Sequence, residues 1–395
     1  MLLALSLCLV WVGECFAEDK ASPASYLYLW VADSSGKAPD FLAVVDARPA
    51  SKTYTRLVAT LPVGVSGTNP HHTEAELHSS GILLANGFAA GKTFIFDLNQ
   101  PAQPSLVGQF EDLGGFSHPH SFLRLDDGSL LVTFQYLHGN HGRPGGLVEL
   151  APDGKFRRAS RSADNSVDPD ARPYSPALLR SIDRVVSTST DMHGELTSRA
   201  VQIWRFSDLE LLDTILLPEA PGGRGAAFTA EPRVLADGKT VLVSTFTCGL
   251  YALTDIDRKP KARFLFKFDG DDCGVPLHLG RYWVQTLESA QEIVVLDIAD
   301  LDHPRIVSRL RFPAGEVPHW VAYDALGKRI VVTGDNALSY RVLLADFDPQ
   351  TGAISWDESF REPGSSRRGI DLQRTEWPHG KGGPGKPHGA VFSLK

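Results

Sequence analysis

Short apolar runs alternate with turn residues along almost the whole chain. Runs such as residues 26–32, 41–46 and 240–246 are rich in Val, Leu, Tyr and Phe and end close to Gly, Asp, Asn or Pro. Runs of this length, bounded by turn residues, are typical of β-strands. Almost no stretch has the 3.6-residue period of an amphipathic helix. The pattern therefore predicts an all-β protein.

The predicted strands group into sets whose starts fall roughly 40 to 60 residues apart, which is the spacing of four-stranded propeller blades. The first set has only three runs, residues 26–32, 41–46 and 56–62, and residues 388–395 supply its missing strand. Pairing the C-terminal strand with the N-terminal strands closes the ring and removes its open edges. We therefore predict a seven-bladed β-propeller closed in this way.

Three segments mark the same hairpin in different blades: Asp-Asp-Gly at 126–128, Ala-Asp-Gly at 236–238 and Ala-Leu-Gly at 325–327. Asp-Gly pairs favour tight hairpin turns. Residues 357–385 are rich in Gly, Pro and Arg, and we expect them to form a long loop over one face before the closing strand.

The N-terminus resembles a secretory signal peptide. An apolar run covers residues 2–13, and small Ala17 stands at the expected cleavage position. The run is too short to cross a bilayer core of about 30 Å. We expect residues 1–17 to be a signal peptide and residues 18–395 a single propeller domain, exported to the periplasm or secreted, without a membrane span.

Charge and cysteine content narrow the function classes. The formal net charge is −8 and no basic stripe is present, so we expect no nucleic-acid partner. No glycine-rich phosphate loop and no Gly-x-Ser-x-Gly elbow occurs. Cys8 and Cys15 leave with the signal peptide, so the mature chain keeps Cys248 and Cys273. A disulfide between them and two buried thiols remain alternatives, because spacing alone does not fix pairing.

Histidines stand where the first strands of several blades begin. His71-His72, His120, His319 and His388 each follow a proline directly. In a propeller the first strand of every blade lines the channel, so these side chains converge at one mouth. Adjacent histidines on one strand point to opposite faces unless the strand bulges, so we expect a bulge or turn at residues 71–72.

Such a cluster predicts a metal site. Imidazole ligands favour copper, with iron or zinc as alternatives, over magnesium or calcium. The candidate ligands are His71, His72, His120 and His388, with His118 and His319 as additional candidates. We expect Glu74 or Glu231 to orient ring N–H groups or accept protons. The alternative for each histidine is a polar channel residue bonded to water. His278 occupies the equivalent place in the sixth blade, and the other histidines are expected on loops or the surface.

Several segments resemble the selenium-binding protein and methanethiol oxidase family. They are Pro70-His71-His72-Thr73, Ser117-His118-Pro119-His120-Ser121, the Asp-x-x-x-Pro-x-x-Pro stretch at 97–104, and Lys386-Pro387-His388-Gly389. The resemblance implies a seven-bladed propeller with His71, His72, His120 and His388 as copper ligands. It also implies oxidation of methanethiol by O2 to formaldehyde, sulfide and peroxide. Two features depart from the family: its Cys-x-x-Cys is absent after His72, and the histidines of the second segment lie two residues apart, not three.

The prediction is therefore an exported copper oxidase of a small thiol, with the thiol and O2 as its small-molecule partners. Three alternatives stay open. A non-haem iron oxygenase is one, because carotenoid-cleaving enzymes hold iron with four histidines on a seven-bladed propeller. The others are a non-catalytic propeller that binds a metal or a protein, and a propeller lactonase or carbohydrate hydrolase.

Overall fold

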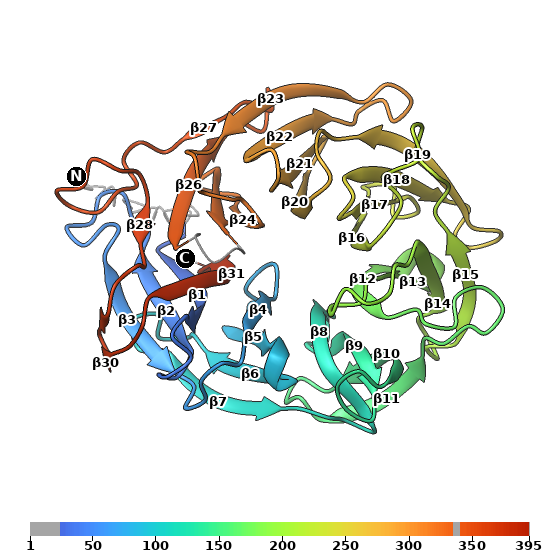
Figure 1. Cartoon of the computed structure of the whole chain (residues 1–395), viewed down its shortest axis with the longest axis horizontal. Helices are drawn as coiled ribbons and strands as arrows, with labels where there is room; N and C mark the ends of the chain where they lie inside the picture. The colour runs from blue at the N-terminus through green and yellow to red at the C-terminus, as the bar shows by residue number, and fades with distance from the viewer. Residues whose placement is uncertain (1–23, 335–339, 395) are drawn as a thin grey trace, which may run out of the picture.

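The chain folds into seven antiparallel sheets arranged as blades around a central axis (Figure 1). The computed structural model describes residues 24–334 and 340–394, so the predicted signal peptide lies outside the described residues. Apart from two short 3-10 turns, η1 (Phe88–Ala90) and η2 (Arg180–Ile182), the described part contains no helix. The prediction of a seven-bladed, all-β propeller is confirmed.

Each blade has four strands, which are named here from the axis outward. Blade 1 contains β31 (Gly385–Phe392), β1 (Tyr26–Asp33), β2 (Phe41–Asp46) and β3 (Leu57–Pro62). Blade 2 contains β4 (Pro70–Thr73), β5 (Ile82–Gly87), β6 (Lys92–Asp97) and β7 (Ser105–Phe110). Blade 3 contains β8 (Phe116–Arg124), β9 (Leu130–Leu137), β10 (Arg143–Leu150) and β11 (Phe156–Arg161).

The other blades repeat this order. Blade 4 contains β12 (Pro173–Leu179), β13 (Arg184–Ser189), β14 (Ala200–Arg205) and β15 (Leu211–Leu216). Blade 5 contains β16 (Thr229–Val234), β17 (Val241–Thr245), β18 (Gly249–Thr254) and β19 (Lys261–Lys267). Blade 6 contains β20 (Cys273–Leu279), β21 (Tyr282–Leu287), β22 (Glu292–Asp297) and β23 (Arg305–Arg311). Blade 7 contains β24 (Trp320–Asp324), β25 (Arg329–Thr333), β26 (Arg341–Phe347) and β27 (Ile354–Trp356).

The ring is closed by the C-terminal strand. β31 pairs antiparallel with β1, so that Leu27 faces Phe392 and Val31 faces Pro387. This confirms the predicted closure, although the strand begins at Gly385 and not at His388. The closing pair also carries His388 from the end of the chain to the axis.

The hydrophobic core lies between neighbouring blades. β2 and β22 are buried at every position, whereas the outer strand β7 is mostly exposed. A strand that is covered on both faces needs apolar residues at nearly every position. The middle strands therefore appear in the sequence as continuous apolar runs. Trp30 of blade 1 packs against Phe94 and Phe96 of blade 2, with ring centroids 5.5 and 5.7 Å away.

Two of the three predicted hairpin glycines adopt the left-handed conformation. Gly128 has φ 79° and Gly238 has φ 66°. In the third hairpin Lys328 takes the left-handed conformation, with φ 53°. Gly327 is needed there for space, because a Cβ on it would lie 2.3 Å from an Asp324 carboxylate oxygen.

The segment before the closing strand is more ordered than the expected loop. It adds β28 (Ile370–Asp371) to β26 and forms a small hairpin from β29 (Glu376–Trp377) and β30 (Gly380–Lys381). Phe360, Leu372 and Trp377 are buried in the same apolar cluster as Phe41. The segment therefore covers blades 7 and 1 through its apolar side chains.

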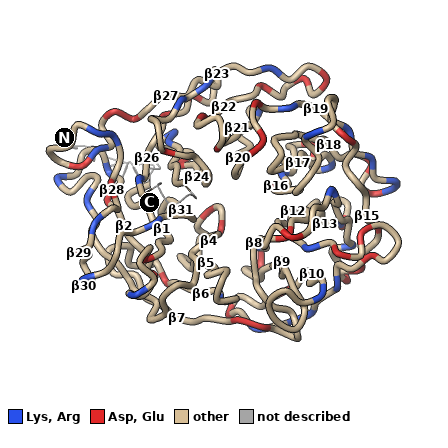
Figure 2. The backbone as a smooth tube through the Cα atoms, viewed as in Figure 1, with Lys and Arg blue, Asp and Glu red and all other residues tan. Residues whose placement is uncertain are grey.

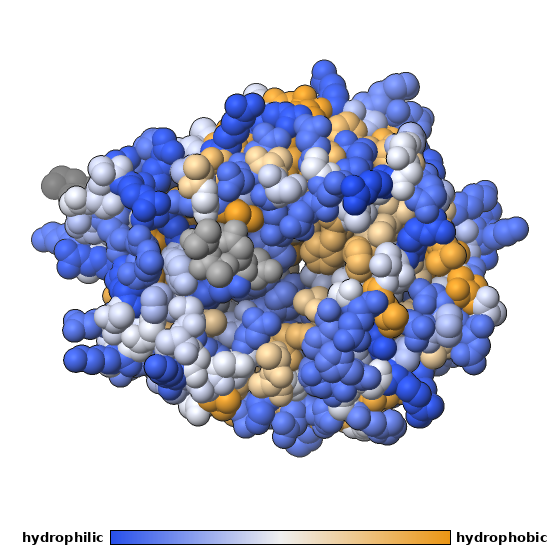
Figure 3. All heavy atoms as spheres, in the orientation of Figure 1, coloured by the Kyte–Doolittle hydropathy of each residue, from blue (hydrophilic) through white to orange (hydrophobic). Residues whose placement is uncertain are grey.

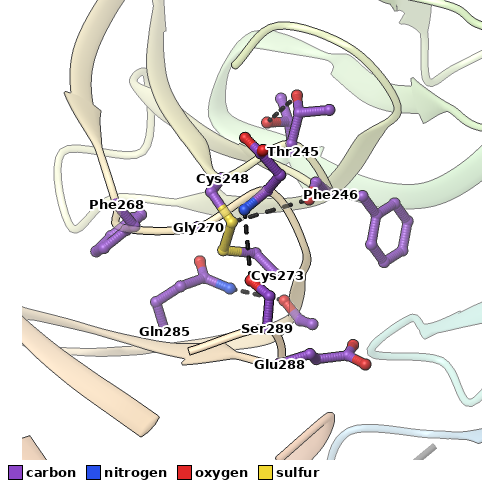
Figure 4. Close-up of a disulfide and its surroundings, with 12 residues drawn as sticks. Thr245, Phe246, Cys248, Phe268, Gly270, Cys273, Gln285, Glu288 and Ser289 are labelled. Atoms are coloured by element: carbon purple, nitrogen blue, oxygen red, sulfur yellow. Dashed lines mark hydrogen bonds between the residues drawn. A yellow bond between two sulfur atoms is a disulfide. The ribbon is translucent and has the colours of Figure 1, made fainter. Parts of the chain in front are cut away.

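Cys248 and Cys273 form a disulfide, which decides between the two alternatives left open by the sequence. The bond joins the residue before β18 to the first residue of β20, and therefore links blades 5 and 6 (Figure 4). Positive and negative residues are interspersed around the rim (Figure 2). Among the described residues, no helix is long and apolar enough to cross a membrane.

Candidate metal centre

The innermost strand of six blades bulges at one level of the channel. In blade 2, Pro70 pairs with Gly87 and Thr73 with Ala85, so His71 and His72 together face a single residue. The doublets formed in this way are His71-His72, His120-Ser121, Tyr174-Ser175, Ala230-Glu231, Gly274-Val275 and His388-Gly389. A bulge re-aims adjacent side chains that a regular strand would send to opposite faces. The bulge predicted at residues 71–72 is confirmed.

Polar side chains on the neighbouring strand support these bulges. The backbone N–H of His72 donates to Asn86 Oδ1 at 2.7 Å, and that of Ser121 donates to Thr133 Oγ1 at 3.0 Å. Thr188 and Ser244 accept the equivalent N–H groups in blades 4 and 5. A bulge leaves a backbone N–H group without its usual partner on the neighbouring strand. These buried side chains accept the hydrogen bond in place of that partner.

Three histidines meet at the axis. His71, His72 and His120 each offer a ring nitrogen, and the three nitrogens lie within 4.8 Å of one another. The Nε2 atoms of His71 and His120 are 3.1 Å apart. The ring of His388 lies 4.2 Å from that of His71 and 5.9 Å from that of His72, measured between centroids. All four side chains are buried. The predicted convergence therefore brings together four histidines from three distant segments of the chain.

Hydroxyl and carbonyl groups, not carboxylates, contact two of these rings. His120 Nδ1 lies 2.9 Å from the carbonyl oxygen of Tyr174 and 2.9 Å from Ser121 Oγ. His72 Nδ1 lies 3.1 Å from the same Ser121 hydroxyl, and its Nε2 lies 3.2 Å from the Tyr174 hydroxyl. With its Nδ1–H donated to the carbonyl, His120 presents the Nε2 lone pair toward His71. Sequence reasoning missed Ser121 and Tyr174.

The two carboxylates expected at the site have other partners. Glu74 forms a two-pronged ion pair with Arg124, at 2.8 Å for each bond, and also accepts the backbone N–H of Leu84. Glu231 accepts the Ser175 hydroxyl at 2.8 Å and an Arg233 N–H at 2.6 Å. The structure therefore does not bring Glu74 to the histidines, whereas Glu231 lies at the bulge level of blade 5.

The additional candidates His118 and His319 lie outside the group of three. The ring of His118 packs against Phe88 and Tyr136, at 5.6 and 5.4 Å. The ring of His319 lies 4.7 Å from that of His388. Its Nδ1 is bonded to the carboxylate of Glu288, a residue that follows β21. Glu288 is thus the carboxylate that contacts a histidine here, and sequence reasoning did not find it.

Burial favours the neutral form of three of the central histidines, His72, His120 and His388. It lowers the pKa of His120 to about 3, from an ordinary value near 6.5. Burial, together with the neighbouring imidazoles, also holds the pKa values of His72 and His388 well below that value. Neutral imidazole is the form that binds metals, so these rings carry available lone pairs at neutral pH.

A cavity of about 370 Å³ lies on one side of the histidines. Its wall at the bulge level is formed by His72, Ser121, Ser175, Glu231, Val275 and Trp320. Further along the axis it is lined mainly by apolar residues such as Leu123, Leu178 and Leu279. His72 is the member of the histidine group that borders this cavity. In the space-filling view the axial region is hollowed on the face toward the viewer (Figure 3).

No protein-family model matches the chain. A methanethiol oxidase from Ruegeria pomeroyi is 30% identical over 138 residues, which are 33% of this chain and 31% of that protein. One from Hyphomicrobium is 31% identical over 125 residues, 30% of this chain and 28% of that protein. This chain is similar to methanethiol oxidases. The similarity spans less than a third of the length of either relative.

Solved structures share the fold. A hypothetical selenium-binding protein from Sulfolobus tokodaii superposes with a TM-score of 0.73, at 14% identity, and 95% of each chain is covered. A periplasmic gluconolactonase from Pseudomonas aeruginosa gives a TM-score of 0.61, at 15% identity, covering 94% of this chain and 99% of the other. The resemblance to selenium-binding proteins and methanethiol oxidases, first based on the histidine segments, is confirmed.

Proposed function

We propose that this chain is an exported, copper-dependent oxidase of a small thiol, similar in its reaction to methanethiol oxidases. The observation that carries the proposal is the axial histidine group, in which His71, His72 and His120 present three ring nitrogens within 4.8 Å of one another. The similarity to methanethiol oxidases supplies the reaction class. The disulfide supports export, since disulfides persist in oxidising compartments.

The donor set fits a transition metal. Two imidazole nitrogens 3.1 Å apart have the spacing of neighbouring ligands around one ion, because metal–imidazole bonds are about 2.0–2.1 Å long. Nitrogen donors without carboxylate oxygens suit copper, iron or zinc, and among divalent ions copper binds most tightly. Of these metals, zinc has no redox chemistry, so an oxidase requires copper or iron.

Different residues of the chain would bind the metal and orient its ligands. His71, His72, His120 and His388 would hold the copper, which, when bound, would supply electron transfer between thiol and O2. The Ser121 hydroxyl lies between His72 and His120 and would fix both rings. The reaction balances when one methanethiol, one dioxygen and one water give one formaldehyde, one hydrogen sulfide and one hydrogen peroxide.

The cavity would position the substrate. Its contact with His72 would give a small thiol an approach to the metal, and apolar side chains such as Leu123 and Leu178 would contact the methyl group. Glu231 borders the same cavity, and its carboxylate contacts the guanidinium of Arg233. We assign to Glu231 the acceptance of the thiol proton, so that the thiolate reacts.

The test is to express the full-length chain with copper, purify it, and measure metal content together with methanethiol-dependent O2 uptake. We expect close to one tightly bound copper per chain and stoichiometric formation of formaldehyde, sulfide and peroxide. His72→Ala and His388→Ala should each lose metal and activity with an unchanged circular dichroism spectrum. The matched control is His303→Ala, which removes an exposed histidine from the loop between β22 and β23 of blade 6.

Other outcomes would point to the alternatives. Copper without thiol-dependent O2 uptake would indicate a metal-binding or protein-interaction propeller. Iron in place of copper would favour the oxygenase. A chelator-resistant hydrolysis of lactones, the reaction class of the gluconolactonase with the same fold, would contradict the oxidase.

A further inference from the structure

A second group of histidines lies beside the axial group, on blades 3 and 4. His118 belongs to β8, His141 to the loop between β9 and β10, and His193 to the loop between β13 and β14. The rings of His141 and His193 are stacked, with centroids 3.8 Å apart and planes at 17°. Tyr136 packs against all three rings, at 5.4 to 6.3 Å. We call His118, His141 and His193 the outer histidine group.

Both exposed rings of the outer histidine group are held through one nitrogen. His193 Nε2 lies 2.6 Å from the amide oxygen of Asn140. His141 Nδ1 lies 3.5 Å from a carboxylate oxygen of Glu195. A ring that donates one N–H to an oxygen carries its lone pair on the other nitrogen, and metal-binding histidines are typically oriented in this way. His193 Nδ1 is therefore available to bind a metal, and a contact of His141 Nδ1 with Glu195 would leave Nε2 of that ring available.

The buried member has a nitrogen without a partner. His118 is only 8% exposed, and its Nδ1 has no hydrogen-bond partner among the described residues. A buried polar atom left without a partner lowers the stability of the fold. A bound ion would give this nitrogen a partner, so the observation points to a ligand and not only to packing.

One aromatic ring lies close to both the outer histidine group and the axial group. Phe88 lies 5.6 Å from His118 and 6.0 Å from His193, and it also lies 5.7 Å from His120 and 6.1 Å from His71, measured between ring centroids. The two groups are therefore neighbours without sharing a ligand. Among the described residues only the axial group has three donors within 4.8 Å, so the outer rings must turn to meet one ion.

We propose that the outer histidine group is a second transition-metal site, which binds imidazole-preferring divalent ions such as Zn²⁺ or Cu²⁺ more weakly than the axial group. Imidazole donors with one nearby carboxylate suit these ions. The affinity is lower because exposed side chains lose rotamer freedom when they turn toward the ion. The proposal does not rest on the oxidase function, since it concerns other residues and metal binding alone.

The test is a Zn²⁺ titration of the full-length, metal-free protein, purified with a tag that contains no histidine and followed by calorimetry. We expect two ions per chain, the second bound at least about tenfold more weakly. The double substitution His141→Ala/His193→Ala should leave only the tight ion, whereas His72→Ala should leave only the weak one. Asn140→Ala, which releases His193 without removing a ligand, should weaken the second ion by about tenfold or more.

The matched control is His303→Ala/His379→Ala, which removes two histidines away from blades 3 and 4 and should still bind two ions. Circular dichroism establishes that each variant is folded, and Asn140→Ala gives an independent answer if the double variant is not. The proposal is overturned if the wild type binds one ion, or if the double variant still binds two. It is also overturned if either the double variant or His72→Ala loses both ions, because the sites would then not be separate.

Discussion

At the scale of single residues, the decisive contact is between one hydroxyl and two imidazoles. Ser121 Oγ lies 3.1 Å from His72 Nδ1 and 2.9 Å from His120 Nδ1. Through these contacts it fixes the rotation of both rings at once. It is itself the second residue of a bulge doublet, and its backbone N–H is held by Thr133. The orientation of two candidate ligands therefore depends on a side chain that would not bind the metal itself.

Ser121→Ala should lower the affinity for the axial metal by about 10- to 100-fold, the usual effect of removing a group that orients a ligand. Competition with a chromophoric chelator measures this change. Ser117→Ala is the control, because Ser117 lies on the same strand and bonds to the backbone of Gly139. Equal affinities of the two variants would contradict an orienting role for Ser121.

Burial of the histidines also predicts acid sensitivity of the metal-free protein. The pKa of His120 is about 3 when folded and near 6.5 when unfolded. Between these values the unfolded chain binds a proton that the folded chain does not, so the free energy of unfolding falls as pH falls. The loss per pH unit is at most about 1.4 kcal/mol for each such histidine.

Urea unfolding of the chelator-treated protein at pH 7.5, 6.5 and 5.5 measures this dependence. In His120→Asn the unfolded and folded states should differ by up to one bound proton less than in the wild type. The free energy of unfolding of this variant should therefore depend less steeply on pH. The expectation fails if the metal-free wild type is as stable at pH 5.5 as at pH 7.5.

At the scale of elements, the bulged inner strand is the unit that builds the site. Gly389 shows how tightly β31 approaches β4, because a Cβ on it would lie 2.8 Å from both the carbonyl oxygen of His71 and the backbone nitrogen of Thr73. Glycine therefore permits the contact that sets His388 against His71. This is a requirement for space and does not involve a left-handed conformation.

Gly389→Ala should destabilise the protein by about 1–3 kcal/mol, the usual cost of overpacking, and should reduce axial metal binding by moving His388. Thermal unfolding and metal analysis measure both effects. Gly108→Ala on the outer strand β7 is the control, since its nearest contact would be an ordinary 3.5 Å. Wild-type metal content in the Gly389 variant would show that His388 is not needed.

The elements also show how far the sequence predicts the site. The convergence of His71, His120 and His388 was predictable, because a blade repeat brings the starts of its inner strands to one level. Ser121 and Tyr174 were not, since their role depends on the bulge register. The pairing of Glu74 with Arg124 was not predicted, because Arg124 lies fifty residues further along the chain. The sequence feature that could have indicated the bulges is the polar residue opposite each of them, such as Asn86 or Thr133.

At the scale of the whole molecule, the fold and the proposed metal are held by separate interactions. The ring closes through the β1–β31 ladder and the apolar clusters between blades. The disulfide adds a covalent link between blades 5 and 6. None of these interactions requires an ion. The propeller therefore differs from small domains that unfold when their metal is removed.

Chelation should accordingly leave the β-sheet content unchanged while lowering the thermal midpoint. A ligand at 100 times its dissociation constant stabilises the folded state by about 2.7 kcal/mol, and this contribution disappears with the metal. Circular dichroism at 25 °C and a melting curve, each with and without chelator, separate the two effects, and added copper should restore the midpoint. If chelation abolished the sheet signal, the ring closure would depend on His388 as a ligand, and β31 would be held by the metal and not by its pairing with β1.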